Sequence, residues 1–256
     1  MPFLSKIHIN PARRTGREML RNPHLVHGMV MHGIPGEPTG ERILWRLDSP
    51  NPYRPQLLVL TDAKPDWSHI TEQAGWPHSD TEPFAIRDYS TLFAHLATGR
   101  EFAFRLTANP VENTMTPIKP TPAQQRRRAA GDTRGFRISH RTAAHQLDWL
   151  LRRADTWGFT IPPARTDTPA PGLGNSPTPA PDVRITAREQ RRFHKKDNGP
   201  GATGRLITLT TVTFEGRLAV TDPAVLRDRL VNGIGPAKAY GCGLLTLAPL
   251  PGPRHG

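Results

Sequence analysis

Apolar and polar residues alternate at a period of two in four stretches of the first 110 residues, and this pattern constrains the fold most. A period of two places successive side chains on opposite faces of a strand, so each stretch is expected to be a strand with one buried face. The four stretches are FLSKIHI (3–9), RILWRLD (42–48), QLLVLTD (56–62) and EFAFRLTA (101–108).

Helical segments separate these strands. The stretch YSTLFAHLA (89–97) has helical spacing and ends before Gly99, and a first helix lies between the first two strands. The resulting order is β-α-β-β-α-β, which is typical of the ferredoxin-like fold that RNA-recognition (RRM-like) domains also use. We therefore expect an α+β domain of this type over residues 1–110.

The second half repeats this outline, with a beginning that is harder to place. Residues 140–256 are expected to form a second, tandem ferredoxin-like domain, because helical and strand patterns alternate along them. The patterns are a helix in HRTAAHQLDWLLRRADTWGF (140–159), a strand in LITLTTVTFEGRLAVT (206–221), a helix opened by Asp222 and Pro223 (222–233) and a strand in GLLTLAP (243–249).

Two segments lack sustained periodicity. Residues 111–139 are rich in proline, threonine and arginine and are expected to be a mobile basic linker. Residues 160–182, TIPPARTDTPAPGLGNSPTPAPD, have low complexity and are expected to be an exposed extended insertion.

The charge balance indicates the class of partner. The formal net charge is +12, with 34 Lys+Arg against 22 Asp+Glu, which suits an anionic polymer such as a nucleic acid; an acidic membrane surface would also fit. No stretch resembles a signal peptide or a membrane span, and the single cysteine, Cys242, excludes an internal disulfide and a multi-cysteine zinc site. We expect a cytoplasmic protein with no cofactor or metal.

Three histidines lie in the short segment NPHLVHGMVMHGIPG (22–36). Asn22 and Pro23 are typical of a helix start, and Gly33 of a helix end. At about 100° per residue, His24, His27, Gly28 and Met31 fall opposite the apolar arc of Leu25, Val26, Met29 and Val30.

Three interpretations of these histidines stay open at this point. They can be solvated surface groups, or they can transfer protons on a phosphodiester, since an unperturbed histidine titrates near neutrality. A metal site is disfavoured, because the spacings do not bring all three rings to one point and the segment has no acidic residue.

The stretch GIGPAKAYGCGLL (233–245) carries four glycines, Gly233, Gly235, Gly241 and Gly243, together with Lys238. Such a loop can direct backbone amides and an ammonium group at an anion, or it can be a tight turn that needs positive φ. It matches neither a Walker A loop nor a dinucleotide fingerprint.

A basic arm precedes another glycine-rich turn and is expected to be a protruding hairpin. It can enter a nucleic-acid groove or form a solvated face. Its cations are Arg184, Arg188, Arg191, Arg192, Lys195 and Lys196.

Several stretches together resemble a known family, the CasE-type CRISPR repeat-RNA endoribonucleases of type I-E systems. The resemblance covers nearly the whole chain except the two proline-rich segments, and the C-terminal block is its most specific part. The stretches are FLSKIHINPARR, LWRL, FRLTANP, QLDWLLRR, VTFEGRLAV and GIGPAKAYGCGLLTLAPL.

This resemblance implies two tandem ferredoxin-like domains that bind the stem-loop of a CRISPR repeat, cut once at its 3′ base and keep the product within a Cascade complex. It matches His27 with the family's catalytic histidine and the basic arm with a groove-binding hairpin. His24 stands where some members have tyrosine and His32 where some have lysine, and both differences affect the roles assigned to these positions.

The chemistry expected is attack by the ribose 2′-hydroxyl, giving a 2′,3′-cyclic phosphate and a 5′-hydroxyl without a metal. His27 would transfer one proton, more naturally as general base, His24 would take the other or position the hydroxyl, and Lys238 or an arginine would neutralise the phosphate. The main alternative is a non-catalytic RNA-binding scaffold subunit. A membrane-surface protein is a more distant one.

Overall fold

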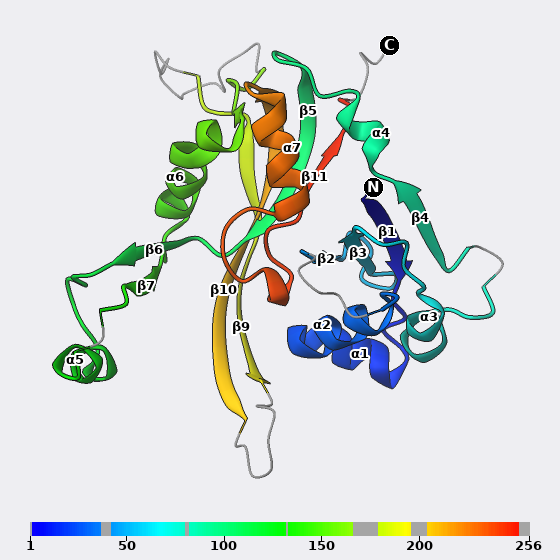
Figure 1. Ribbon diagram of the computed structural model, residues 1–256, viewed down its shortest axis with the longest axis horizontal. Helices are drawn as coiled ribbons and strands as arrows, with labels where there is room; N and C mark the ends of the chain where they lie inside the picture. Colours follow the sequence, from blue (N-terminus) through cyan, green and yellow to red (C-terminus); the bar gives the residue numbers. More distant parts are fainter. Residues whose placement is uncertain are drawn as a thin grey trace, which may run out of the picture.

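The strands of the protein form two sheets and a separate two-stranded ribbon (Figure 1). The structure, a computed structural model, describes residues 2–36, 42–79, 82–131, 133–165, 179–195 and 204–250.

The first sheet has the strand order β2-β3-β1-β4, and all of its neighbouring strands are antiparallel. Two helices follow β1 and one follows β3, so the arrangement is ferredoxin-like, as predicted. The elements are β1 (Phe3–His8), α1 (Arg14–Arg21), α2 (Pro23–His32), β2 (Leu44–Asp48), β3 (Gln56–Thr61), α3 (Ser68–Ala74) and β4 (Phe84–Asp88).

The second sheet has the order β11-β5-β10-β8, and β9 also pairs with β10. It is the second ferredoxin-like unit, with α6 and α7 packed on one face. Its elements are β5 (Glu101–Ala108), α6 (Ala143–Ala154), the 3-10 turn η1 (Asp155–Trp157), β8 (Phe159–Thr160), β9 (Val183–Lys195), β10 (Arg205–Val220), α7 (Pro223–Asn232), the 3-10 turn η2 (Lys238–Tyr240) and β11 (Leu245–Ala248).

The strand expected at 101–108 is present as β5, but the expectation that it closes the first sheet is wrong. It pairs with β10 and β11 of the second sheet, and β4 closes the first. The segment expected as the last helix of the first unit gives only the single turn α4 (Ser90–Phe93), whereas α3 fills that role. Alternation shows which face of a strand is buried but does not show which strand pairs with it. The pattern of β5 is therefore compatible with either sheet.

The segment 111–139, expected to be an unstructured linker, contains regular structure. It forms the ribbon β6 (Val111–Thr114) and β7 (Phe136–Ser139), with helix α5 (Pro122–Ala129) between the two strands. The side chain of Thr121 accepts a hydrogen bond from the backbone of Gln124, whose side chain accepts one from the backbone of Thr121. This capping box, with proline in the first turn, explains why α5 forms without a buried face.

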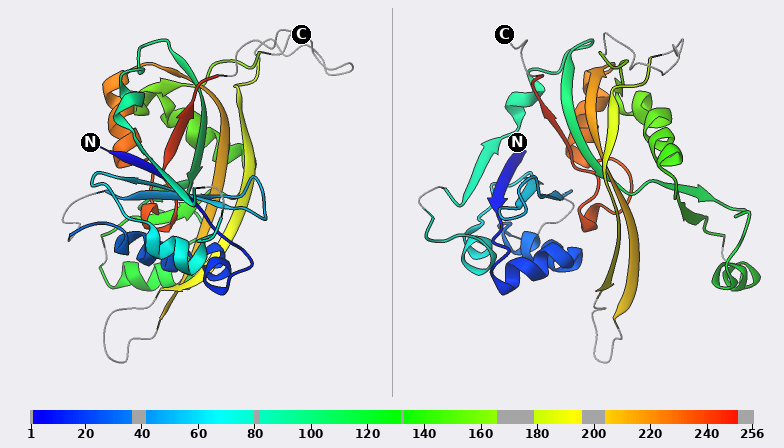
Figure 2. Two further views of the ribbon diagram at one scale, coloured as in Figure 1. Left: turned by 90° about the vertical axis from the view of Figure 1, so that its right-hand side faces the viewer. Right: turned by 180° about the vertical axis from the view of Figure 1, so that it is seen from behind.

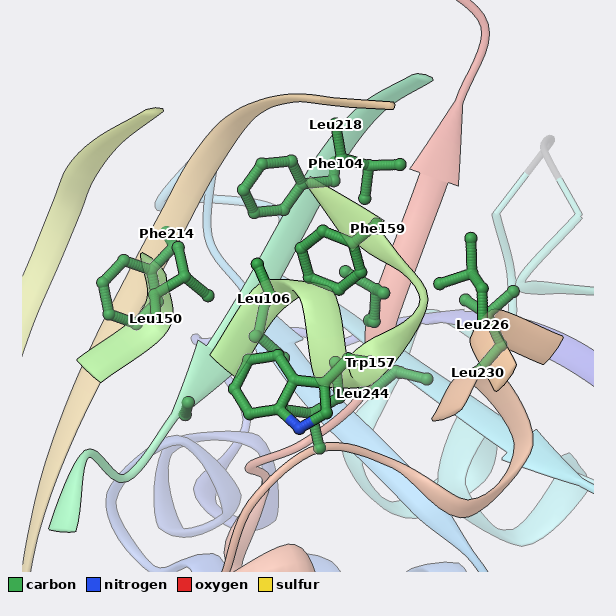
Figure 3. Close-up of a cluster of buried hydrophobic side chains, with 14 of the residues drawn as sticks. Phe104, Leu106, Leu150, Trp157, Phe159, Phe214, Leu218, Leu226, Leu230 and Leu244 are labelled. Atoms are coloured by element: carbon green, nitrogen blue, oxygen red, sulfur yellow. The ribbon is translucent and has the colours of Figure 1, made fainter. Parts of the chain in front are cut away.

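The larger core joins the two units. Buried apolar side chains of β5, β10, α6 and α7 form most of it. Figure 3 shows Phe104 of β5 together with Trp157 of η1 and Phe159 of β8, which belong to the same cluster. Leu44 of β2 and Leu60 of β3 belong to the same cluster. The first sheet therefore packs its second face on the other unit, while its helices cover the opposite face in a separate core.

A buried ion pair reinforces this joint. Arg46 on β2 is 2% exposed and forms a bidentate pair with Asp48, at 2.8 Å for both bonds. Its remaining N–H groups donate to the backbone oxygens of Arg105 and Leu244 and to the hydroxyl of Thr246. All five N–H groups of the guanidinium are thus satisfied, which fixes the first unit against β5 and β11.

The basic arm forms a hairpin, as predicted. β9 and β10 pair from Lys195 and Arg205 back to Val183 and Gly216 and extend beyond the body of the second unit (Figure 2). The insertion expected at 160–182 falls mostly outside the described residues. In the part of the chain that is described, no helix has the length and apolar character needed to cross a membrane.

Candidate functional site

The helix that carries the histidines, α2, has the start and end that its sequence predicts. The side chain of Asn22 accepts a hydrogen bond from the backbone N–H of His24 at 3.0 Å, and Pro23 occupies the first turn. Gly33 caps the end of the helix. These local signals position His24 and His27 in the first half of a rigid element.

The two faces of α2 differ as the helical spacing predicts. Val26 and Val30 are fully buried in the core of the first unit, whereas His24 and His27 are partly exposed. A methyl group added at Gly28 would meet no atom within 4 Å, so the surface beside the two histidines is open. A ligand can approach the backbone closely there.

The accessible edge of the His27 ring is defined by its surroundings. Its Nδ1 atom is buried, so proton exchange with a bound ligand would take place at Nε2. His32 lies elsewhere: it is exposed at the end of α2 and lines a separate hollow with Asp66 and His69. His69 contacts the Met29 carbonyl through Nε2 at 2.8 Å.

The glycine-rich stretch forms a loop around η2, and α2 packs against both η2 and β9. The histidine-bearing helix of the first unit thus lies beside the loop and the arm of the second unit (Figure 1). The interpretation of this loop as a turn that needs positive φ is confirmed. The φ angles are 73° at Gly233, 74° at Gly235, 63° at Ala237, 83° at Gly241 and 93° at Gly243.

Two of these glycines let the loop dock on β2. A Cβ atom at Gly241 would lie 2.6 Å from the Trp45 ring, and one at Gly233 would lie 2.7 Å from the side chain of Leu44. Such distances are far below van der Waals contact, so only glycine allows this approach. The docking holds Lys238 near the first unit.

Lys238 lies in an electropositive environment. Burial lowers the pKa of its ammonium group, and the positive charges of Arg42 and Arg229 lower it further. Asp228 acts in the opposite direction and raises this pKa, but the cations outweigh it. A bound anion would relieve the remaining repulsion between the cations. Arg42 and Arg229 were not among the residues singled out from sequence, because only the fold brings them near Lys238.

We expect Gly241→Ala to destabilise the protein by about 1–2 kcal/mol through its positive φ, with an added cost from the clash with Trp45. Gly28→Ala is the matched control, because the new methyl group has open space and alanine favours a helix. Thermal unfolding of both variants checks this. A Gly241→Ala melting temperature equal to that of the original protein would contradict the docking role of this glycine.

The arm residues do not share one face. Ala187 and Arg191 line a cleft of about 490 Å³ between the hairpin and the first unit, which Leu20 and Asp48 also line. Arg188 and Gln190 line a groove on the opposite side of the hairpin, and Glu189 borders both hollows. The alternation of β9 thus separates the arginines that the sequence groups together.

Several arm cations have partners within the protein. Arg188 donates through Nε to the side chain of Gln146 at 2.8 Å. Arg191 pairs with Glu189 at 2.8 Å, and Arg184 pairs with Glu215 at 3.4 Å.

Arg192 and Lys195 lie toward the C-terminal end of β9. Arg192 donates to the side chain of Gln190 at 3.4 Å. The backbone of Lys195 ends β9, and Lys196 lies outside the described residues. The role of these side chains toward a ligand stays a prediction.

The site therefore combines two imidazoles, one ammonium group and nearby guanidinium groups along the junction of two units. Within the described ranges, no group of three or more His, Cys, Asp or Glu side chains could hold a metal ion. Histidines can exchange protons and cations can bind a phosphate, so the arrangement suits proton-transfer chemistry on a phosphodiester.

Comparisons with known proteins find a matching family and relatives that align over nearly the whole chain. A family model described as CRISPR associated protein matches residues 2–249. The chain is 32% identical to the CRISPR-associated endoribonuclease Cse3 of Thermus thermophilus over 250 residues, covering 96% of this chain and 100% of the relative. It is 29% identical to the Cascade subunit CasE of Escherichia coli, covering 97% of this chain and 100% of the relative.

Solved structures give the same result. The fold is similar to Cse3 bound to a 19-nucleotide RNA, with a TM-score of 0.68 and 28% identity, covering 97% of this chain and 99% of the other. It is also similar to Thermus thermophilus Cse3 bound to an RNA that represents a pre-cleavage complex, with a TM-score of 0.67, 30% identity and the same coverage of both chains.

Proposed function

The chain belongs to the CRISPR-associated protein family, as the match over residues 2–249 shows, and from this premise we propose how it processes CRISPR RNA. It is a CasE-type endoribonuclease that cleaves precursor RNA once, at the 3′ base of the repeat stem-loop. Two relatives that align over their full length, an endoribonuclease and a Cascade subunit, support this assignment.

One observation supports the mechanism above all others: α2 carries His24 and His27 on its open face and packs beside the loop that holds Lys238. Proton-transfer groups and a phosphate-binding cation thus lie on adjacent elements of two different units. An RNA strand placed at this junction would meet both.

The reaction proceeds by attack of a ribose 2′-hydroxyl on the adjacent phosphate. His27 accepts the proton of the 2′-hydroxyl through Nε2 as the oxygen attacks phosphorus. The bond from phosphorus to the 5′-oxygen breaks as that oxygen takes up a proton, from His24 or from a water molecule. The products are a 2′,3′-cyclic phosphate and a 5′-hydroxyl, and no metal or water nucleophile is required. General acid-base catalysis by a positioned histidine contributes about 10²–10⁴-fold to such a step.

The phosphate gains negative charge in the transition state, and Lys238 is placed to stabilise it. Its own pKa is lowered by burial and by Arg42 and Arg229, so a bound phosphate would strengthen its charged form. The close docking of the glycines on β2 holds Lys238 in place, which limits the reorganisation needed during the reaction.

The partners follow from the same assignment. The protein binds the hairpin of a CRISPR repeat, keeps the cleaved RNA and joins other subunits in a type I-E Cascade complex. The relative from Escherichia coli is named as a Cascade subunit, and relatives of known structure are bound to RNA. Strong positive charge, +12 overall, favours retention of an RNA product.

A second candidate is an RNA-binding scaffold subunit without catalytic activity. The basic arm and the cationic junction could bind and retain an RNA hairpin without cleaving it. Single-turnover incubation of an end-labelled repeat hairpin with excess protein separates the two. One shorter labelled product supports the endoribonuclease. Intact RNA in a stable complex would support the scaffold.

We expect His24→Ala to slow cleavage less than His27→Ala does. His24 shares the open face with His27 and is suited to position the 2′-hydroxyl or to protonate the leaving group. Single-turnover rates at saturating protein measure the effect. Equal losses for the two variants would identify an acid-base pair, and an unchanged rate would remove His24 from the site.

The arm and Lys238 are expected to act on different steps. Arg191→Ala combined with Arg192→Ala should flatten the slope of log K against log salt by up to about 2, because each phosphate contact contributes about 0.7–0.9. Cleavage at saturation should be little changed. Lys238→Ala should instead lower the saturated rate, since a misplaced phosphate loses in-line geometry. An unchanged salt slope in the double variant would show that both arginines only face solvent.

A further inference from the structure

The ribbon of β6 and β7, with α5 at its end, projects away from both sheets, on the side of the hairpin opposite α2 (Figure 1). Its helix contributes no side chain to any of the three buried clusters. A two-stranded ribbon of this kind gains little from burial and is at best marginally stable alone. We therefore explain the presence of this ribbon by what its surface binds, since it contributes little to the stability of the fold.

The ribbon is strongly basic. Residues 111–141 contain seven Lys or Arg side chains and only two acidic ones, Glu112 and Asp132. Those that the structure describes lie on the outside of the molecule. The seven are Lys119, Arg126, Arg127, Arg128, Arg134, Arg137 and Arg141.

The ribbon and the outer face of the β9-β10 hairpin enclose a groove of about 830 Å³. Lys119 and Arg137 line it from the ribbon, and Arg188 and Gln190 line it from β9. Glu189 also borders the groove, but its carboxylate is paired with Arg191 at 2.8 Å. Apart from Ile138 and Glu189, the lining side chains are cations and polar hydrogen-bonding groups.

The groove is built as part of the fold. Arg188 connects the hairpin to α6 by donating to Gln146, which is 1% exposed, and to the backbone oxygen of Arg141 at the end of the ribbon. The side chain of Gln146 donates to the backbone oxygen of His140 at 2.7 Å. These contacts hold the root of the ribbon at a fixed distance from the hairpin, so both walls of the groove are preformed.

We propose that this groove binds a second stretch of RNA phosphodiester backbone, separate from the strand that carries the scissile phosphate. The inference rests on the proposed function and extends it. The hairpin has one face toward α2, where Arg191 lies, and one toward the ribbon. If the β9-β10 hairpin lies between the two strands of an RNA stem, its inner face meets the strand that is cleaved. The outer groove then meets the other strand of the stem.

Charge favours RNA over a protein in this groove. Lys119 and Arg137 on the ribbon and Arg188 on β9 place positive charge on both walls, and Thr208 and Thr210 add hydroxyls suited to phosphate or ribose oxygens. The most exposed apolar side chains of this segment, Met115 and Ile118, do not line the groove, and Ile138 is the one large apolar side chain among the groove-lining residues.

The test compares Lys119→Ala combined with Arg137→Ala against the original protein, with a noncleavable repeat hairpin carrying a 2′-deoxy nucleotide at the cut site. Two lost phosphate contacts should flatten the slope of log K against log salt by about 1.4–1.8. Both side chains are exposed, so folding should be unaffected. Lys119→Arg with Arg137→Lys, which keeps both charges, should restore the slope.

The matched control is Lys64→Ala combined with Arg87→Ala, which removes one lysine and one arginine from exposed positions of the first unit that do not line the groove. Its slope should change by much less. Ethylation of phosphates on the uncut strand should weaken binding to the original protein and not to the groove variant.

Single-turnover cleavage of all-ribose RNA separates this inference from the proposed function. The groove variant should cut saturated RNA at the normal rate, and absence of cleavage by the original protein would overturn the proposed function itself. Normal cleavage with an unchanged salt slope in the groove variant would overturn the inference and leave the groove to a protein or to solvent.

Discussion

His27→Ala is expected to reduce the single-turnover rate of repeat-RNA cleavage by about 10²–10⁴-fold, the usual contribution of a positioned acid-base group. Binding of the RNA hairpin should stay within a few-fold of the original protein. The reason is that, in the proposed mechanism, His27 exchanges a proton through Nε2 and holds no phosphate. Its ring is only partly exposed, on a face of α2 that does not contribute to the core.

The measurement is the rate at saturating protein, accompanied by a binding curve with noncleavable RNA. His78→Ala is the matched control, because it removes an exposed histidine from a loop of the same unit. It should leave both quantities unchanged. Parallel loss of binding and cleavage in His27→Ala would assign this residue to RNA binding and remove the proton-transfer role.

A 2′-deoxy nucleotide immediately 5′ to the scissile phosphate is expected to abolish cleavage and leave binding intact. The substitution deletes the nucleophile itself, so no arrangement of protein groups can replace it. This is the largest effect that the mechanism predicts, because without the 2′-hydroxyl only the uncatalysed attack of water on the phosphate remains.

The control substrate carries the 2′-deoxy substitution one nucleotide away, where the hydroxyl takes no part in bond formation. It should be cut at nearly the normal rate. Efficient cutting of the substrate modified at the cleavage position would demonstrate a water nucleophile, and the assignment of His27 as base toward the ribose would then be wrong.

Much of the fold could be predicted from sequence, because alternation and helix-end signals are local. The strands at 3–9, 42–48 and 56–62 and the order of the second unit after residue 140 are confirmed. The partner of β5 could not be predicted in this way, because pairing with β10 depends on contacts about a hundred residues apart. The short helix α3 was missed, since seven residues show too little periodicity.

The helix α5 could have been found from sequence. Threonine, proline and glutamine at positions 121, 122 and 124 form a capping-box pattern with proline at the first helical position. The linker prediction was therefore wrong for a reason that the sequence itself contained.

The candidate site, like the fold, could be predicted from sequence only in part. The open face of α2 follows from helical geometry alone, and the positive φ angles of the glycine-rich loop were one of its two predicted interpretations. The juxtaposition of α2 with η2 could not be predicted from spacing, because it depends on how two units pack. The same is true of Arg46, whose buried pair with Asp48 has no local signature in the sequence.

The central claim is that cleavage uses the ribose hydroxyl and histidine without a metal. Its most direct test is single-turnover cleavage of a labelled repeat hairpin in excess EDTA, followed by analysis of the new ends. We predict an undiminished rate, a 2′,3′-cyclic phosphate on the 5′ fragment and a 5′-hydroxyl on the 3′ fragment. Loss of cleavage in EDTA, with rescue by a divalent cation and a 5′-phosphate on the 3′ fragment, would contradict the account.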